Sequence, residues 1–325
     1  MLAQLPFVSI VTPFYNEQAG IKLFYDRLVP VLEALKDIRF EVICVDDGSR
    51  DQTLGLLLEL SQRDGRFRVI ELSRNFGKEA ALTAGIDAAL GDAVIPIDAD
   101  LQDPPELIAQ MIHLWREGAD VVLARRVDRS TDSLVKRGTA SLFYRLHNRL
   151  SSISLPQNVG DFRLMNRPAV DALKKLPEQQ RFMKGLFAWV GFRTSTVEYS
   201  RQSRAAGGSK FSGWTLWNFA LEGITSFSTA PLRIWTYLGL FISSLTLIYA
   251  SFIVLRTLVS GVDVPGYASL LVAVLFLGSL QLISIGVLGE YVGRIYLESK
   301  HRPPYIVRQE YLPQDLTKTD RAHGS

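Results

Sequence analysis

Residues 94–105 read VIPIDADLQDPP, an apolar run typical of a buried strand that leads directly into three acidic residues. Along a strand and its extension, residues i and i+2 point the same way, so we expect Asp98, Asp100 and Gln102 to share one face. Oxygen ligands of this kind suit a hard divalent cation, Mg²⁺ or Mn²⁺, that bridges to substrate phosphates and neutralises the acidic cluster. Alternatively, Asp103, which precedes two prolines, caps the next helix.

The acidic run belongs to a longer alternation of strand-like and helix-like segments. Strands are predicted at 7–11, 40–45, 68–72, 93–97 and 120–124, and helices at 20–35, 53–63, 78–90 and 105–117. This alternation predicts βαβ units, and therefore an α/β fold with a mostly parallel, Rossmann-like sheet and helices on both faces. Ligands of such sheets bind beyond the carboxyl ends of the strands, where the acidic run lies.

Two more polar segments follow predicted strands. In TPFYNEQ, residues 12–18, Pro13 shapes the turn, Tyr15 offers a ring for stacking and Glu17 offers acceptors to a ribose or base. The alternative is a plain turn before a helix. In CVDDGSRDQT, Asp47 either faces a pyrimidine N–H or caps the helix that starts at Thr53.

The composition predicts a membrane segment. The 325 residues are 47% hydrophobic and 21% charged, and the apolar runs 234–255 and 270–292 each have about the length that crosses a hydrocarbon core. A short link makes them a transmembrane hairpin, although a buried hairpin of a soluble domain has the same pattern. The net charge of +3, without a long basic block, argues against a nucleic-acid partner.

Basic residues orient this hairpin. The connecting side offers Arg256 alone, whereas the flanks carry Arg233, Arg294, Lys300, Arg302 and Arg308. The positive-inside rule then puts both flanks in the cytoplasm. We therefore expect a multi-pass protein of the inner (plasma) membrane with its catalytic domain in the cytoplasm.

Two segments between the sheet and the hairpin suit a membrane surface. Residues 133–150 read as a basic amphipathic helix that either lies on anionic lipid or packs with its basic face in solvent. In RAAGGSK, Arg204 and Lys210 flank two glycines, so the segment suits a phosphate-binding lid or a plain flexible loop. The expected domains are a catalytic domain (1–212), an interfacial amphipathic region (213–232), a transmembrane part (233–296, with helices at about 234–256 and 269–292) and a cytoplasmic tail (297–325).

Together, TPFYNE, VDDGSRDQT, SRNFGKEAALTAG, DADLQDPPEL and GDFRLM, followed by two apolar spans, resemble the family 2 glycosyltransferases of the GT-A fold. The chain is most similar to the polyprenyl-phosphate sugar transferases, such as bactoprenol glucosyltransferases of the GtrB type and, more distantly, dolichol-phosphate mannose synthases. The resemblance extends to about residue 310. It implies an inverting transferase that moves a sugar from a nucleotide-sugar to a polyprenyl phosphate such as undecaprenyl phosphate, and it makes a homo-oligomer plausible.

The resemblance also implies roles for matching positions. The nucleoside would be held by Pro13, Tyr15, Glu17 and Asp47, and the metal and diphosphate by Asp98, Asp100 and Gln102. Asp161 would lie at the reacting centre with Arg163 nearby, and phosphates would meet Arg126, Arg204 and Lys210, with Lys78 as a further candidate. Because a phosphate monoester is largely ionised at neutral pH, Asp161 is expected to orient the sugar, the acceptor or a basic partner, and to act as a base only secondarily.

The sugar stays open on sequence grounds. The resemblance favours glucose from UDP-glucose, and aminoarabinose or mannose donors are the alternatives. A processive polysaccharide synthase is disfavoured because residues 179–182, QQRF, do not match the Gln-x-x-Arg-Trp motif of those enzymes. A non-catalytic membrane scaffold that binds nucleotide-sugars is disfavoured by the pair Asp98 and Asp100.

Overall fold

Within the part of the chain that the structure describes, eight strands form one sheet with the order β7-β5-β6-β4-β1-β2-β3-β8. The computed structural model describes residues 5–127, 158–176, 178, 181, 183–199, 230–260 and 266–312. The strands are β1 (Phe7–Phe14), β2 (Arg39–Asp46), β3 (Phe67–Leu72), β4 (Ala93–Pro96), β5 (Val121–Arg126), β6 (Val159–Asn166), β7 (Thr194–Tyr199) and β8 (Val307–Tyr311). The helices are α1 (Ile21–Ala34), α2 (Thr53–Arg63), α3 (Lys78–Ala88), the short η1 (Pro105–Leu107), α4 (Ile108–Arg116), α6 (Arg167–Lys174), α7 (Met183–Trp189), α9 (Ala230–Ser260) and α10 (Tyr267–Ser299).

The sheet is mostly parallel, and the predicted α/β class is confirmed. Strand β1 pairs parallel with β2 and with β4, and β2 pairs parallel with β3. Strand β5 pairs parallel with β7. Two strands reverse this direction: β6 pairs antiparallel with β4 and β5, and β8 pairs antiparallel with β3. The carboxyl ends of the parallel strands therefore share an edge with the start of β6.

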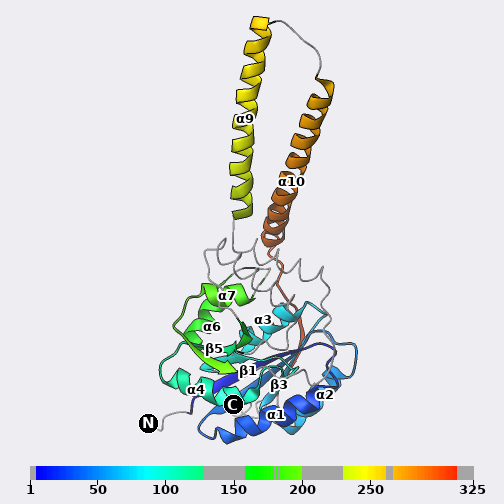
Figure 1. The fold of residues 1–325 in the computed structure, drawn as a ribbon. Helices are drawn as coiled ribbons and strands as arrows, with labels where there is room; N and C mark the ends of the chain where they lie inside the picture. Colours follow the sequence, from blue (N-terminus) through cyan, green and yellow to red (C-terminus); the bar gives the residue numbers. More distant parts are fainter. Residues whose placement is uncertain are drawn as a thin grey trace.

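Helices cover both faces of the sheet (Figure 1). One apolar cluster joins the sheet to α1, α2 and α4, and includes Phe24, Leu57 and Met111. The other joins it to α3, α6 and α7, and includes Leu82 and Val170. The continuous apolar character of the central strands follows from this burial on two faces.

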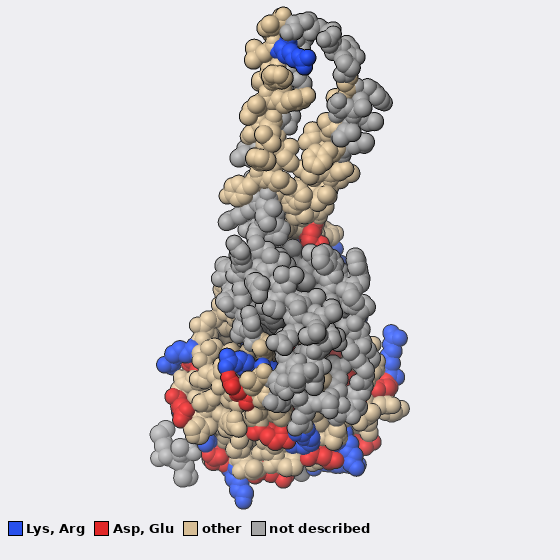
Figure 2. Space-filling model, in the orientation of Figure 1, with Lys and Arg blue, Asp and Glu red and all other residues tan. Residues whose placement is uncertain are grey.

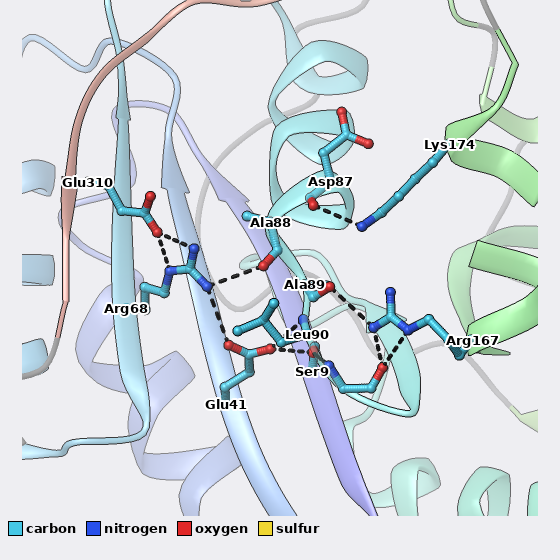
Figure 3. Close-up of polar contacts among 11 residues, drawn as sticks. Ser9, Glu41, Arg68, Asp87, Ala88, Ala89, Leu90, Arg167, Lys174 and Glu310 are labelled. Carbon is cyan, nitrogen blue, oxygen red and sulfur yellow. Dashed lines mark hydrogen bonds and ion pairs between the residues drawn. The ribbon is translucent and has the colours of Figure 1, made fainter. Parts of the chain in front are cut away.

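The last turn of α3 is held by basic side chains (Figure 3). Lys174 donates to the carbonyl of Asp87 over 2.8 Å, Arg68 to that of Ala88 over 3.2 Å and Arg167 to that of Ala89 over 3.2 Å. The final carbonyls of a helix carry partial negative charge, so cations there stabilise it. Helix α3 is therefore fixed at the end opposite its first residue, Lys78.

Helices α9 and α10 project together from one end of the α/β part, as the sequence predicted for an apolar hairpin (Figure 1). Charged side chains gather on the α/β part, whereas the drawn surface of the hairpin is almost uncharged (Figure 2). Among the described helices, one segment, Phe276–Ser299, has the length and composition to cross a membrane. The second span remains a prediction.

The structure differs from the sequence prediction after the hairpin. Within residues 297–325, which were expected as a cytoplasmic tail, Val307–Tyr311 form β8, a strand at one edge of the sheet that the sequence did not predict. The cytoplasmic location of this segment stays a prediction. The amphipathic segment 133–150, the interfacial region before the hairpin and both Arg204 and Lys210 lie outside the described residues, apart from the start of α9.

Close packing of α3 on the sheet generates a stability prediction. A Cβ on Gly85 would lie 2.2 Å from Val11 Cγ1 and 3.1 Å from Val45 Cγ2, both buried. We expect Gly85→Ala to lower the free energy of unfolding by about 1–3 kcal/mol through overpacking. The matched change Gly55→Ala in α2 meets only the Gln52 side chain at 3.7 Å and should raise it by about 0.5–1 kcal/mol. Thermal unfolding of both variants tests this, and equal shifts would contradict it.

Candidate active site

Two carboxylates share one ammonium group at the carboxyl edge of the sheet. Lys78 Nζ lies 2.8 Å from Asp98 Oδ2 and 2.8 Å from Asp161 Oδ2. Burial alone would lower the pKa of Lys78, but the charges of Asp98 and Asp161 outweigh it and raise that pKa. Lys78 therefore stays charged at neutral pH. From sequence, Lys78 is a further candidate for phosphate binding, and in the structure it lies at the centre of this cluster.

Three elements bring these groups together. Asp98 follows β4, whose last residue is Pro96. Asp161 lies near the start of β6, and because β6 is antiparallel to β4 and β5, this start lies at their carboxyl ends. Lys78 begins α3 directly after Gly77, whose φ of +99° favours glycine. The cluster therefore depends on one reversed strand and one helix start.

The acidic run after β4 is a turn and not a strand extension. The strand ends at Pro96, and Leu101 has a φ of +54°. The expected alternation of Asp98, Asp100 and Gln102 on one strand face is therefore wrong in its geometry. Instead, the Gln102 amide donates to Asp100 Oδ1 over 3.1 Å, which folds the run back on itself.

Asp103 does not cap the following helix. The N-cap of η1 is Pro104, which makes no side-chain cap bond. The buried Asp103 accepts a hydrogen bond from the Tyr199 hydroxyl at the end of β7. Sequence reasoning missed Tyr199, although it also ends a parallel strand. Asp103 therefore connects the acidic turn to β7, the strand at one edge of the sheet.

Asp47 holds the loop in front of α3. Its Oδ1 accepts from the Phe76 amide over 2.7 Å, and its Oδ2 accepts from Asn75 Nδ2 and the Gly77 amide, each over 2.9 Å. Asp47 is 2% exposed, and burial raises its pKa against the effect of these donors. The predicted cap of α2 is not formed by Asp47. Its predicted contact with a pyrimidine remains untested.

The loops after β1 and β2 are joined at the same edge. The Glu17 amide donates to Thr53 Oγ1 over 2.9 Å, and the Arg50 amide donates to Asn16 Oδ1 over 2.9 Å. Tyr15 is 40% exposed beside them. Pro13 lies within β1, opposite Val45 of β2, whereas Tyr15 and Glu17 follow β1 next to the loop after β2. The nucleoside-binding role of all three stays a prediction.

Arg163 and Arg126 take different positions. Arg163 is 4% exposed, donates to the Gly160 carbonyl over 2.6 Å and lies 3.9 Å above the Phe187 ring. Burial lowers its pKa to about 10. Arg163 therefore supports the start of β6 from within the core, and its predicted role in substrate binding stays a prediction. Arg126 ends β5, and its amide donates to the Asn158 carbonyl over 3.0 Å, which puts it at the edge near Asp161.

The cluster fits a divalent cation in its chemistry. Asp98, Asp100 and Asp161 offer carboxylate oxygens, the donors that Mg²⁺ and Mn²⁺ prefer, and Asp98 and Asp161 meet at Lys78. Within the described part of the chain, no group of three or more His, Cys, Asp or Glu is placed to hold a metal ion. Mg²⁺ commonly keeps water and substrate phosphate oxygens among its ligands, so a site with few protein ligands is consistent with it.

Comparisons with known proteins cover both parts of the chain. Residues 9–174 match the family model for glycosyl transferase family 2, and residues 230–295 match the GtrB C-terminal hairpin. An uncharacterised glycosyltransferase of Synechocystis is 56% identical over 94% of this chain and 97% of its own length. The bactoprenol glucosyl transferase of Shigella phage SfV is 55% identical over 93% of this chain and 98% of its own.

A solved structure is a more distant likeness. The glucosyl-3-phosphoglycerate synthase of Mycobacterium tuberculosis, in complex with Mn²⁺, UDP and phosphoglyceric acid, is 19% identical at a TM-score of 0.48. The match covers 68% of this chain and 76% of the synthase chain. At this level of similarity, it assigns neither a metal nor a donor to the chain.

The contacts of Asp47 generate a local prediction. Asp47→Asn replaces an acceptor of three hydrogen bonds with an amide whose NH₂ group would face N–H donors. We expect a loss of about 2–3 kcal/mol in the free energy of unfolding and faster hydrogen exchange at the Phe76 and Gly77 amides. The control is Asp26→Asn at an exposed position of α1, which should change neither. Unchanged exchange at those two amides would contradict the role of Asp47.

Proposed function

The chain belongs to glycosyl transferase family 2, and from this premise we propose that it transfers glucose from UDP-glucose to a polyprenyl phosphate at the cytoplasmic face of the membrane. One observation carries the proposal. Similarity to the bactoprenol glucosyl transferase extends through both the α/β part and the hairpin. The chain is a glycosyltransferase. Its hairpin matches the GtrB C-terminal hairpin, which supports a polyprenyl phosphate as the acceptor.

The hairpin has a physical reason in this reaction. A polyprenyl chain leaves lipid at a cost of about 0.8 kcal/mol per CH₂, so the acceptor stays in the bilayer and the active site must come to the headgroup plane. We propose that α9 and α10 both span the inner membrane and keep the α/β part at its cytoplasmic surface. The basic residues on the flanks of the hairpin support this orientation.

The chemistry needs charge control more than a strong base. A phosphate monoester has its second pKa near about 6, so the acceptor oxygen is already ionised at neutral pH. This oxygen attacks the anomeric carbon, while the bond from that carbon to the diphosphate breaks and its electron pair stays on the diphosphate. Two negatively charged substrates must therefore meet beside Asp98 and Asp161. Attack from the face opposite the leaving group inverts the anomeric centre.

Residues of the chain would divide this work. Lys78 and Arg126 would neutralise phosphate charge, and Asp161 would fix the direction of the Lys78 ammonium group. The loop residues Tyr15 and Glu17 would hold the nucleoside. Asp98, Asp100 and Gln102 would hold Mg²⁺ or Mn²⁺, which supplies Lewis-acid stabilisation to the leaving diphosphate.

The function is tested directly by transfer. Purified full-length protein is incubated with undecaprenyl phosphate, Mg²⁺ and one of a panel of radiolabelled UDP- and GDP-sugars, and label in the organic phase is counted. We expect label from UDP-glucose, its loss in Asp100→Asn, and full transfer by the exposed control Asp26→Asn. Label from another donor would replace glucose by that sugar. No label from any donor with folded protein would reject the proposed function.

The ammonium group of Lys78, shared by Asp98 and Asp161, leads to a prediction about the kinetic constants. In Asp161→Asn, Lys78 keeps Asp98 but loses one of its two anionic partners. We expect kcat to fall on the order of tenfold to a hundredfold, with the donor KM changed less than about twofold, and a larger fall in Lys78→Met. Lys22→Met, at an exposed position of α1, is the matched control. Nearly full turnover in Asp161→Asn would remove this residue from the reacting centre.

A further inference from the structure

The chain returns to the α/β part after the hairpin. Helix α10 ends at Ser299, and the chain then runs down to β8 at the edge of the sheet (Figure 1). The Ser73 amide donates to the Ile306 carbonyl over 2.9 Å, and β8 continues antiparallel to β3. Residues 305–311 are called the anchor segment here.

Complementary charges join the anchor segment to β3. Arg68 of β3 forms an ion pair with Glu310. Glu71 of β3 accepts from Arg308 over 2.8 Å at Oε1 and from the Tyr311 hydroxyl over 3.0 Å at Oε2. The Glu71 side chain is 8% exposed, so both oxygens of a buried carboxylate are satisfied by β8. These pairs select one register, because a slip of one residue would turn each partner to the opposite face.

The same contacts reach α3 (Figure 3). Arg68 lies between Glu310 and Glu41, 3.6 Å from the latter, and also donates to the carbonyl of Ala88. Ahead of β8, the Tyr305 hydroxyl donates to Asp87 Oδ2 over 2.9 Å. The last turn of α3 is therefore bonded to the chain that leaves the hairpin. Helix α3 has 11 residues, about 16 Å, and Lys78 stands at its other end.

The link between α10 and β8 is short. Residues 300–306 connect them, and seven extended residues span at most about 25 Å. With β8 docked, this length limits how far the site can move from the end of α10. With β8 released, that limit disappears.

We propose that the anchor segment holds the α/β part at a fixed height and orientation relative to the hairpin, so that Lys78 and its partners meet an acceptor phosphate confined to the bilayer surface. Tyr305, Arg308 and Glu310 are thus positioning residues that act through β3 and α3. This inference rests on the proposed function, since it needs an acceptor that stays in lipid. It assigns to the anchor segment a role in acceptor use and none in donor binding.

Reversing the charge of Glu310 or Arg308 distinguishes an effect on acceptor use from an effect on donor binding. Glu310→Arg puts a cation opposite Arg68, and Arg308→Glu puts a carboxylate opposite Glu71. With undecaprenyl phosphate in phospholipid vesicles, we expect kcat to fall on the order of tenfold or more, because small misplacements of reacting groups cost up to about a hundredfold. The donor KM should stay within about twofold. The conservative changes Glu310→Asp and Arg308→Lys should restore most of the turnover.

A matched reversal controls for charge alone. Glu59→Arg alters an exposed carboxylate of α2 that lies 3.7 Å from Arg63, so it should leave both kinetic constants unchanged. If the donor KM rises as much as kcat falls in Glu310→Arg, or if kcat does not fall, the positioning role is overturned. Wild-type transfer, measured in the same vesicles, reports on the proposed function separately.

An engineered disulfide between β3 and β8 tests whether the anchor segment docks on its own chain during transfer. Ile70 and Glu310 are partners across β3 and β8, at a spacing that suits a disulfide between Ile70→Cys and Glu310→Cys. Burial raises the pKa of the native Cys44 thiol, which keeps it unreactive. We expect a cross-link within one chain and full transfer in the oxidised protein. A cross-link between two chains, or transfer that returns only on reduction, would overturn the proposal.

Discussion

The site depends on one ammonium group that two carboxylates share. Lys78 joins Asp98, which follows β4, to Asp161 near the start of β6. Without a cation between them, these carboxylates would repel each other at the point where four parallel strands end. The start of α3 therefore determines the arrangement of the acidic groups, and whatever fixes α3 also fixes the site. Asp47 does this at one end, through Phe76 and Gly77, and the basic residues on the last turn do it at the other.

The part of the site that parallel strands build could be predicted from sequence. The residues after β1, β2 and β4 were expected at one edge, because the alternation of strands and helices is a local pattern with a known geometric consequence. Asp161 reached this edge in the prediction by resemblance alone. Its strand is antiparallel, and nothing in the local pattern of residues 159–166 gives a direction. Contacts such as Asp103 with Tyr199, 96 residues apart, depend on the final strand order and lie beyond periodicity.

The edge strand β8 was missed for a different reason. Its sequence, VRQEY, has two charged residues among five and four exposed positions, so it carries no apolar signal. Such composition is what edge strands use against unwanted pairing. The signal that specifies β8 is the match of Arg308 and Glu310 to Glu71 and Arg68 on β3, which becomes visible only when the two strands are side by side.

Docking by charge has a consequence for how firmly the α/β part is held. In the proposed function the hairpin attaches the chain to lipid, and the bonds proposed to orient the α/β part on it are ion pairs and hydrogen bonds at a sheet edge. Exposed pairs of this kind contribute about 0–1 kcal/mol each and weaken with salt. The buried carboxylate of Glu71 is the exception, because undocking β8 would remove both groups that bond its oxygens. Undocking therefore removes both bonding partners of Glu71, whereas Arg68 keeps Glu41 and the carbonyl of Ala88 when Glu310 leaves.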